Sequence, residues 1–530
     1  MKAPPDDSQG MSEVAELRDL MRALAEQVDG LTRENAALRA ENQQLKDEIA
    51  RLKRLPPRPP FAPSGMEKAS AAPASTPAQP RRRGPKPDRA TREVIVKADA
   101  PAGSRFKGYA TLLLRELTMS ADVIAYRRER WLTPQGKMIV APAPAGIVGG
   151  FGPNLRQFCL VMHTQGQVTT ERLTSILNGA GVAISKRQIV RLLTGNLDAF
   201  VAEDQAVLKA GLASSSFITV DDTGALHQRR DNVTTQIGGD SFTVFRTGAA
   251  KSRRNFLSLL RAGSDAYVAN EEALRFMQRA GVEASICDRL RRHPCKTFAG
   301  EQAWLMHLAS LSLDVFDRNL VRILTEGALW GAVRAEGLMQ DTVVVSDDAG
   351  QFRVADHALC WVHAERLMQK LMPATARQER AVKTVRDRVW KLYRALKLWK
   401  AQPVPEATGA LAACFDKIFT VRTGFPDLDR LLARLHRRKA SLLKVLERPE
   451  IPLHTNASEN DLRACVTKRK ISGGTMSVEG RQARDVMLGL MKTCRKLDLS
   501  FFAYLGARLG CGDPADPPPP LATLVARPAA

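Results

Sequence analysis

The chain has 530 residues, of which 44% are hydrophobic, and it carries a formal net charge of +23. This length exceeds what one hydrophobic core usually serves, so we expect three or more structural units, most of them helical. The positive charge indicates a polyanionic partner, and the sequence has neither a membrane-length apolar run nor an apolar signal core in MKAPPDDSQG. These features favour nucleic acid over a membrane and predict a cytosolic protein.

Residues 11 to 54 carry a heptad repeat. Asn35 and Asn42 occupy a positions of the repeat. This pattern predicts a parallel two-stranded coiled coil in fixed register, and therefore self-association. The alternative is one amphipathic helix that packs on its own domain, but a seam this narrow gives a globular core little to contact. The leucines of the d positions are Leu17, Leu24, Leu31, Leu38, Leu45 and Leu52.

The segment from 55 to 100 is rich in Pro, Ala, Ser and Arg, and it is predicted to be a basic linker because it cannot bury enough apolar surface to order itself. Its basic cluster has two interpretations, an arm that enters the DNA minor groove or a solvated tether. The cluster consists of Arg81, Arg82, Arg83 and Lys86.

Residues 101 to 200 are predicted to hold a β-hairpin and a helix-turn-helix. The hairpin is centred on Pro134-Gln135-Gly136, and the first helix runs from about Thr169 to Asn178. A capping box over Ser185-Lys186-Arg187-Gln188 then opens a second helix through Leu193. The basic residues Lys186, Arg187 and Arg191 lie where a recognition helix would meet DNA, although a plain helical hairpin fits the same pattern.

Two apolar runs each end on paired aspartates. They are FITVDDTG, from Phe217 to Gly224, and DTVVVSDDAGQF, from Asp341 to Phe352. A buried strand that stops on carboxylates projects them from the sheet end, where α/β folds bind ligands. With Glu459 they form a three-carboxylate set whose hard oxygens suit two magnesium ions. The chemistry predicted is phosphodiester cleavage or transfer.

Glu459 lies in HTNASENDLRACVTKRK, from His454 to Lys470, which is predicted to be a helix with one polar face. Leu462 and Cys465 fall behind that face. In isolation such a face is more often a solvated set of salt bridges than a site. The polar face is made of Asn456, Glu459, Asn460, Arg463, Thr467 and Lys470.

The remaining pattern predicts a ribonuclease H-like α/β domain over 210 to 505. Strands at Val233 to Ile237, Phe242 to Thr247 and Thr342 to Ser346, with a helix that starts near Lys251, complete a β-β-β-α-β order. Apolar residues at helical spacing indicate a mainly helical insertion from about 360 to 450. The tail from 506 to 530 is expected to be disordered.

The cysteines form no CxxC pair, so we expect thiols. The triplet spacing of His357, Cys360 and His363 is compatible with zinc, but no convincing fourth ligand accompanies it.

Four ordered motifs carry a family resemblance. They are VDDTG from Val220, SDDAGQF from Ser346, CWVHAERL from Cys360 and NASENDLRACVTKRK from Asn456. The chain resembles bacterial DDE transposases of the insertion-sequence-66 family, from the heptads to about residue 505. Many members of that family carry a cysteine cluster for zinc before the helix-turn-helix. Here no cysteine precedes Cys159, so no zinc is expected in the N-terminal region.

The resemblance implies that Asp221, Asp347 and Glu459 bind two Mg²⁺ ions, with Mn²⁺ as a substitute, although the neighbours Asp222 and Asp348 remain exchangeable with the first two. The residues that it implies as DNA contacts are Arg463, Lys468, Arg469 and Lys470. His363 and Arg366 match the family's Cys-x-x-His-x-x-Arg motif, which implies that they contact DNA or brace the site, although a structural role for His363 fits equally well. The other supporting residues are Asp222, Asp348 and Asn456.

The function expected from this resemblance is that of a transposase, located with the bacterial nucleoid, that binds terminal inverted repeats and cleaves and transfers DNA strands. Its partners would be transposon ends, target DNA and a second copy of the chain, and the sequence leaves open a need for small accessory proteins of the same element. Two alternatives are a sequence-specific DNA-binding regulator without nuclease activity and an inactive structural partner. All three carboxylates are present, which favours the enzyme.

Overall fold

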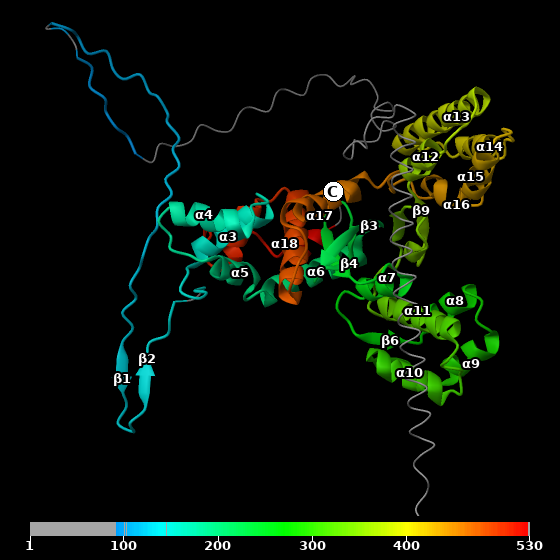
Figure 1. Cartoon of the computed structure of the whole chain (residues 1–530), viewed down its shortest axis with the longest axis horizontal. Coiled ribbons are helices and arrows are strands. Elements are labelled where there is room, and N and C mark those ends of the chain that lie inside the picture. Colours follow the sequence, from blue (N-terminus) through cyan, green and yellow to red (C-terminus); the bar gives the residue numbers. More distant parts are fainter. Residues whose placement is uncertain (1–91, 100, 102, 145, 528–530) are drawn as a thin grey trace, which may run out of the picture. The chain divides into compact units, whose positions relative to one another are not determined.

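The computed structural model describes residues 92–527, apart from residues 100, 102 and 145 (Figure 1). The predicted coiled coil at 11 to 54 and the basic cluster at 81 to 86 lie outside the described residues, as does most of the predicted linker. In the described part, no helix is both long and apolar enough to cross a membrane.

A five-stranded mixed sheet forms the centre of the region predicted over 210 to 505. The strand order is β5-β4-β3-β8-β9. The pairs β5-β4 and β4-β3 are antiparallel, and the pairs β3-β8 and β8-β9 are parallel. Four of these strands were predicted, and β9 was not. The strands are β3 (Phe217–His227), β4 (Arg230–Gly238), β5 (Thr243–Gly248), β8 (Val343–Ser346) and β9 (His357–Leu359).

Strand β3 corrects one prediction, because it does not stop at its aspartates. It continues to His227 and turns tightly into β4 through Gln228 and Arg229, which both have positive φ. Two such residues form a type I′ hairpin turn, but without Asn or Gly there the sequence carries no hairpin signal. The far end of β3 is also held by Thr475, whose amide donates to the Leu226 carbonyl at 3.0 Å. The first aspartate pair therefore lies in the middle of a long strand.

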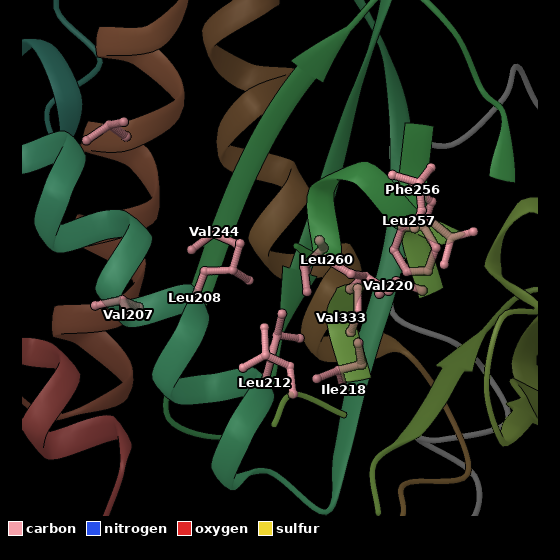
Figure 2. Packing of buried hydrophobic residues seen from close by; sticks show 14 of the residues in the cluster. Val207, Leu208, Leu212, Ile218, Val220, Val244, Phe256, Leu257, Leu260 and Val333 are labelled. Carbon is pink, nitrogen blue, oxygen red and sulfur yellow. The ribbon is translucent and has the colours of Figure 1, made fainter. Parts of the chain in front are cut away.

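Helices from distant parts of the chain cover the sheet. Apolar side chains of α6 (Asp198–Ser214), α7 (Arg253–Leu260) and α11 (Arg318–Ala335) pack against buried residues of β3 and β5 (Figure 2). The helix predicted after Gly473-Gly474 is α18 (Val478–Lys496), and it packs on β5 as expected. The contributing residues shown in Figure 2 are Val207, Leu208, Leu212, Ile218, Val220, Val244, Phe256, Leu257, Leu260 and Val333.

The region between β5 and β8 is larger than the single helix predicted there. Besides α7 and α11 it holds a two-stranded sheet and three further helices, built around Trp304, which is fully buried beside Tyr267 and Phe298. Its strands are only three residues long, too short for an alternating pattern to be recognised. These elements are β6 (Ala266–Val268), α8 (Glu271–Arg279), α9 (Ala284–Arg292), β7 (Thr297–Ala299) and α10 (Gly300–Ser310).

The insertion after β9 is helical, as predicted. The aromatic side chains of Trp361, Phe415 and Phe419 meet in its core, with ring centroids 4.2 to 6.3 Å apart. Its helices are α12 (Trp361–Gln369), α13 (Ala376–Ala401), α14 (Ala407–Phe419), α15 (Pro426–His436) and α16 (Lys439–Leu442), followed by the short 3₁₀ helix Lys444–Leu446. The chain then enters α17 (Asn456–Ser472), which packs on β3 and β4.

The N-terminal elements match the predicted local structure. A short hairpin pairs β1 (Arg130–Leu132) with β2 (Met138–Val140). The capping box at Ser185 is present, with its side chain accepting from the Gln188 amide and the Gln188 side chain accepting from the Ser185 amide. The helices here are α3 (Pro153–Thr164), α4 (Thr170–Gly179) and α5 (Lys186–Thr194).

The C-terminal segment corrects the predicted disordered tail. After α19 (Phe501–Leu509) the chain forms α20 (Leu521–Val525), whose two terminal residues are buried against α6. The Leu521 amide donates to the Glu203 carboxylate, and Arg508 pairs with the same carboxylate. The proline-rich composition of this segment predicted disorder, but its apolar residues Leu521 and Val525 pack against the core.

Candidate active site

The two aspartates of β3 have different surroundings. Asp222 forms an ion pair with Lys251 and accepts a hydrogen bond from Gln351 Nε2 at 3.0 Å. Asp221 accepts only the Asp222 amide, at 2.7 Å. Burial raises the pKa of Asp221 to about 6, the charges of Asp347 and Asp222 add to the rise, and that of His363 opposes it. Asp221 is therefore the member of the pair whose pKa responds to the charge of Asp347, whereas Asp222 contacts the second acid motif through Gln351.

The second aspartate pair follows β8 directly, as predicted. Asp347 accepts a hydrogen bond from the Ala349 amide at 3.0 Å. Asp348 instead forms ion pairs with Arg353, Arg434 and Arg438, at 2.5, 2.6 and 3.3 Å. Burial acts to raise the pKa of Asp348, but these arginines outweigh it and hold the pKa below its usual value. Asp348 thus ties the end of β8 to the helical insertion.

Glu459 lies in the first turn of α17, with its side chain 11% exposed. Arg366 donates two hydrogen bonds to this carboxylate, from Nη1 to Oε1 at 2.6 Å and from Nη2 to Oε2 at 3.2 Å. His363 Nε2 lies 3.7 Å from Oε1. Because His363 and Arg366 are three residues apart on α12, they share a face of that helix and reach the same carboxylate.

The Cys-x-x-His motif lies at the start of α12. Cys360 is the N-cap residue, without a side-chain capping hydrogen bond, and His363 lies in the first turn. The Thr455 amide donates to Cys360 Sγ at 3.3 Å, which joins the start of α12 to the start of α17. Burial acts to lower the pKa of His363, but its hydrogen bond with Cys360 and the charges of Cys360, Asp221 and Glu459 raise the pKa to about 9. His363 therefore interacts electrostatically with two of the predicted ligands, Asp221 and Glu459.

The third member of the zinc-like triplet points elsewhere. His357 Nε2 is 2.7 Å from Ser346 Oγ, at the edge of the sheet. Within the described ranges, no group of three or more His, Cys, Asp and Glu side chains is arranged to hold a metal ion. For Glu459 the reason is visible, because Arg366 already occupies both of its oxygens.

A cavity of about 430 Å³ opens beside the second aspartate pair, and neither Asp221 nor Glu459 lines it. Asp347 and His363 line it together with three cations from the helical insertion, Arg366, Lys370 and Arg434. The lining thus carries both acidic and basic groups. A phosphodiester, which needs counter-charge on its oxygens, has the matching chemistry.

The predicted DNA-contact residues divide into exposed and buried groups. On α5, Lys186, Arg187 and Arg191 are all exposed, and Lys186 pairs with Glu171. On α17, Lys470 is exposed whereas Arg463 and Asn456 are partly buried.

Lys468 corrects the prediction, because its side chain is only 6% exposed and donates to the His163 carbonyl of α3. Burial lowers the pKa of Lys468 to about 8. Arg469 bonds to the Gly224 carbonyl of β3. These two cations anchor α17 within the fold rather than presenting charge to a ligand.

The structure adds three residues that sequence reasoning did not place in the site. Lys251 belongs to the basic segment just before α7, and Gln351 lies within the second acid motif, so both lie in segments that the sequence had marked. Arg434 lies on an amphipathic helix far along the chain, and no sequence motif marks it. All three contact one of the paired aspartates.

The mixed sheet with helices packed on it defines an α+β protein, and the acid motifs with the charged cavity beside Asp347 form its candidate site. A family model for the Transposase IS66 family matches residues 336–483, which include Asp347, Arg366 and Glu459. The uncharacterized protein y4jO of Sinorhizobium fredii (strain NBRC 101917 / NGR234) is 59% identical over 320 residues, which cover 60% of this chain and 99% of that protein. The chain belongs to the Transposase IS66 family.

Proposed function

We propose that this protein is a DDE-type transposase that binds the terminal inverted repeats of an insertion sequence, cleaves the DNA strand there and joins it to target DNA. The observation that carries the proposal is that His363 links the three motifs: it lies 3.7 Å from Glu459 Oε1, its charge acts on Asp221, and it lines the same cavity as Asp347. Their neighbours Asp222 and Asp348 are each occupied by cations outside this group.

The sheet supports the proposal by its topology. Three antiparallel strands followed by two parallel ones, in the order β5-β4-β3-β8-β9, agree with the ribonuclease H-like arrangement expected from the sequence. In this arrangement the central strand β3 carries Asp221, its parallel neighbour β8 ends beside Asp347, and α17 lies across β3 with Glu459. The chain thus brings residues almost 240 positions apart to one edge.

Carboxylate oxygens are ligands that magnesium prefers, although within the described residues the three acids are not arranged to hold an ion. Asp221 and Asp347 have no ion pair within the described residues, and the elevated pKa of Asp221 reflects burial and neighbouring negative charge that a divalent cation would relieve. We propose that these two acids and Glu459 hold two Mg²⁺ ions, or Mn²⁺ in their place, once Arg366 releases Glu459. Such ions supply charge stabilisation at the attacking and leaving oxygens of phosphorus.

The chain's own residues would position the substrate. Arg366, Lys370 and Arg434 line the cavity and can hold phosphate oxygens, with Arg366 exchanging the Glu459 carboxylate for phosphate. Water then attacks the phosphorus at the transposon end and releases a 3′-hydroxyl. That hydroxyl attacks a target phosphodiester, forming a new oxygen–phosphorus bond and displacing the target's own 3′-oxygen.

We also propose that α4 and α5 act as a helix-turn-helix for terminal-repeat recognition. The exposed cations at the start of α5 support this role. Replacing Lys186, Arg187 and Arg191 by alanine should reduce the preference for end DNA over random DNA in a competition binding assay. Unchanged discrimination would remove α5 from recognition.

Self-association is proposed to come from residues 11 to 54, which lie outside the described residues. Removing residues 1 to 54 should lower the oligomeric state measured by sedimentation, because the predicted seam with Asn35 and Asn42 would be lost. An identical oligomeric state with and without this segment would refute the heptad argument.

The test of the enzymatic proposal is strand cleavage on DNA that carries the element's ends, with Mg²⁺ present. Glu459→Gln should lose at least about 100-fold in cleavage rate, since removing one group that stabilises transition-state charge costs roughly 3 kcal/mol or more. DNA binding should survive. Cleavage at the wild-type rate by Glu459→Gln would contradict the proposal, and end binding without any cleavage by the wild-type protein would favour the regulator.

A further inference from the structure

Helix α13 (Ala376–Ala401) presents a basic face that the proposed chemistry does not use. The helix contains nine basic and two acidic residues. Its apolar side is buried in the helical insertion, with Val382, Val389 and Leu396 among the buried residues. Six cations fall on the opposite side, within an arc of about 140° at about 100° per residue. This basic face consists of Arg377, Arg380, Lys383, Arg388, Lys391 and Arg394, all of them exposed.

The six cations of this face form no ion pair within the part of the chain that the structure describes, and Asp387 is the one acid within their arc. On the inner side of the helix, Arg386 pairs with the buried Glu365. The acids available nearby therefore satisfy the inner side of α13 and leave its outer face unbalanced.

The length of this face suits a duplex. The six cations run from Arg377 to Arg394, which are about 26 Å apart along the helix axis. One turn of duplex DNA spans roughly 34 to 36 Å along its axis. Arginine and lysine spread over most of one turn can contact successive phosphates, and only Arg377 lies in the first turn of the helix. The arrangement favours contact with the backbone rather than with base edges.

We propose that the basic face of α13 binds the phosphate backbone of duplex DNA without reading its sequence. The proposal rests on the proposed function in requiring that the protein bind DNA, but it assigns a second surface, separate from α5 and from the cavity beside Asp347. Its role is to hold DNA that passes along the helical insertion, which packs through α12 against the proposed active site.

The experiment measures binding of the full chain to a random-sequence duplex by fluorescence anisotropy over a range of salt concentrations. The test variant is Arg388→Gln, Lys391→Gln, Arg394→Gln. Glutamine keeps helix propensity near that of arginine and lysine, so the exposed face should fold as before. The matched control is Arg279→Gln, Arg292→Gln, Arg318→Gln, which removes the same charge from exposed positions on α8, α9 and α11.

The expected result is a fall of about 0.9 in the log–log salt slope for each lost phosphate contact, or up to about 2.7 for the test variant. Affinity should drop by at least about tenfold at low salt, with the preference for end DNA unchanged, because backbone contacts carry no sequence information. The control should change the slope by less than one contact. Should the triple variant fail to fold, Arg388→Gln and Arg394→Gln measured singly should each lower the slope by about 0.9.

Equal slopes for the test and control variants, with the wild-type protein binding DNA, would overturn the role of α13 and leave the proposed function intact. A wild-type protein that shows no salt-dependent binding to any duplex would overturn both.

Discussion

Helix α17 carries two acids only two positions apart that behave in opposite ways. Asp461 is 5% exposed, accepts a hydrogen bond from Thr243 Oγ1 at 2.6 Å and forms ion pairs with Lys492 and Lys496 of α18. Glu459 faces α12 and the cavity side of the helix, where its partners are Arg366 and His363. Asp461 holds the helix against the core, whereas Glu459 lies on the side of the helix that faces α12.

The comparison extends to the neighbouring elements. Asp485 on α18 accepts from the Thr247 amide and pairs with Arg484, so its charge is also balanced by fixed partners. Asp221 and Asp347 accept only a backbone amide each and lie close enough for their charges to repel. A buried acid with a full set of partners supports the fold, whereas Asp221 and Asp347, which form no ion pair within the described residues, mark a candidate site for a cation.

The largest effect is expected at the balanced acid. Asp461→Asn removes the charge that neutralises Lys492 and Lys496 in a buried setting, so the free energy of unfolding should fall by about 3 to 5 kcal/mol. Denaturant unfolding monitored by circular dichroism would measure it. Glu459→Gln, on the same helix, should change stability by less than half as much, and equal losses would remove the distinction between the two acids.

The next effect sharpens the contrast within one motif. Asp347→Asn should reduce strand cleavage by about 100-fold or more, because it alters the group proposed to stabilise charge at phosphorus. Asp348→Asn should instead lower stability and leave the cleavage rate per folded molecule within about tenfold, since Asp348 serves Arg353 and Arg434. A greater loss of cleavage at Asp348 would reverse the assignment.

The pH dependence follows from the raised pKa of Asp221. In the metal-free protein the folded state holds this proton up to about pH 6, above the unfolded value of 3.8, so stability is greatest below that unfolded value and declines as pH rises through the folded pKa. After allowance for partial exposure, the decline amounts to about 2 kcal/mol. Proposed metal binding needs the charged form, so cleavage should rise with pH through the same window.

Asp204, whose pKa burial also raises to about 6, titrates over the same range. The difference between the wild-type protein and Asp221→Asn in thermal unfolding from pH 4 to 7 therefore isolates Asp221. Parallel stability profiles for the two proteins would contradict the assigned pKa.

The smallest effect concerns one hydrogen bond of the balanced group. Thr243→Val removes the hydroxyl that donates to Asp461, and stability should fall by about 1.5 to 3 kcal/mol, as expected for a bond to a charged acceptor. Thr247→Val would be a matched change next to Asp485, which keeps the Thr247 amide. Thr247→Val should lower stability by less than Thr243→Val does. A larger loss of stability would show that the Thr247 amide is not the main partner of Asp485.

The sequence predicted most of the sheet and the helical character of the insertion, because both rest on local periodicity. It also predicted a site from the two aspartate pairs and Glu459, whereas the choice of Asp221 and Asp347 within the pairs came from the family resemblance. It did not predict β9 or the extension of β3 to His227, since a three-residue strand and a hairpin without Asn or Gly have no local signature. The partners of each acid depend on contacts across the chain.

Contacts across the chain also explain why Lys468 was wrongly predicted to bind DNA. Lys468 follows Glu459 in a basic run, and a helical wheel cannot show that α3 covers it. Likewise Arg434 reaches Asp348 from 86 positions away. Sequence spacing alone therefore does not predict which aspartate of a pair lacks an ion-pair partner.

The most direct test of the central claim compares Asp221→Asn with Asp461→Asn in two measurements on each purified protein, Mg²⁺-dependent strand cleavage and the melting temperature. The account predicts that Asp221→Asn melts at or above the wild-type temperature while losing at least about 100-fold in cleavage, and that Asp461→Asn melts several degrees lower while its folded fraction still cleaves. Cleavage by Asp221→Asn at the wild-type rate would contradict it.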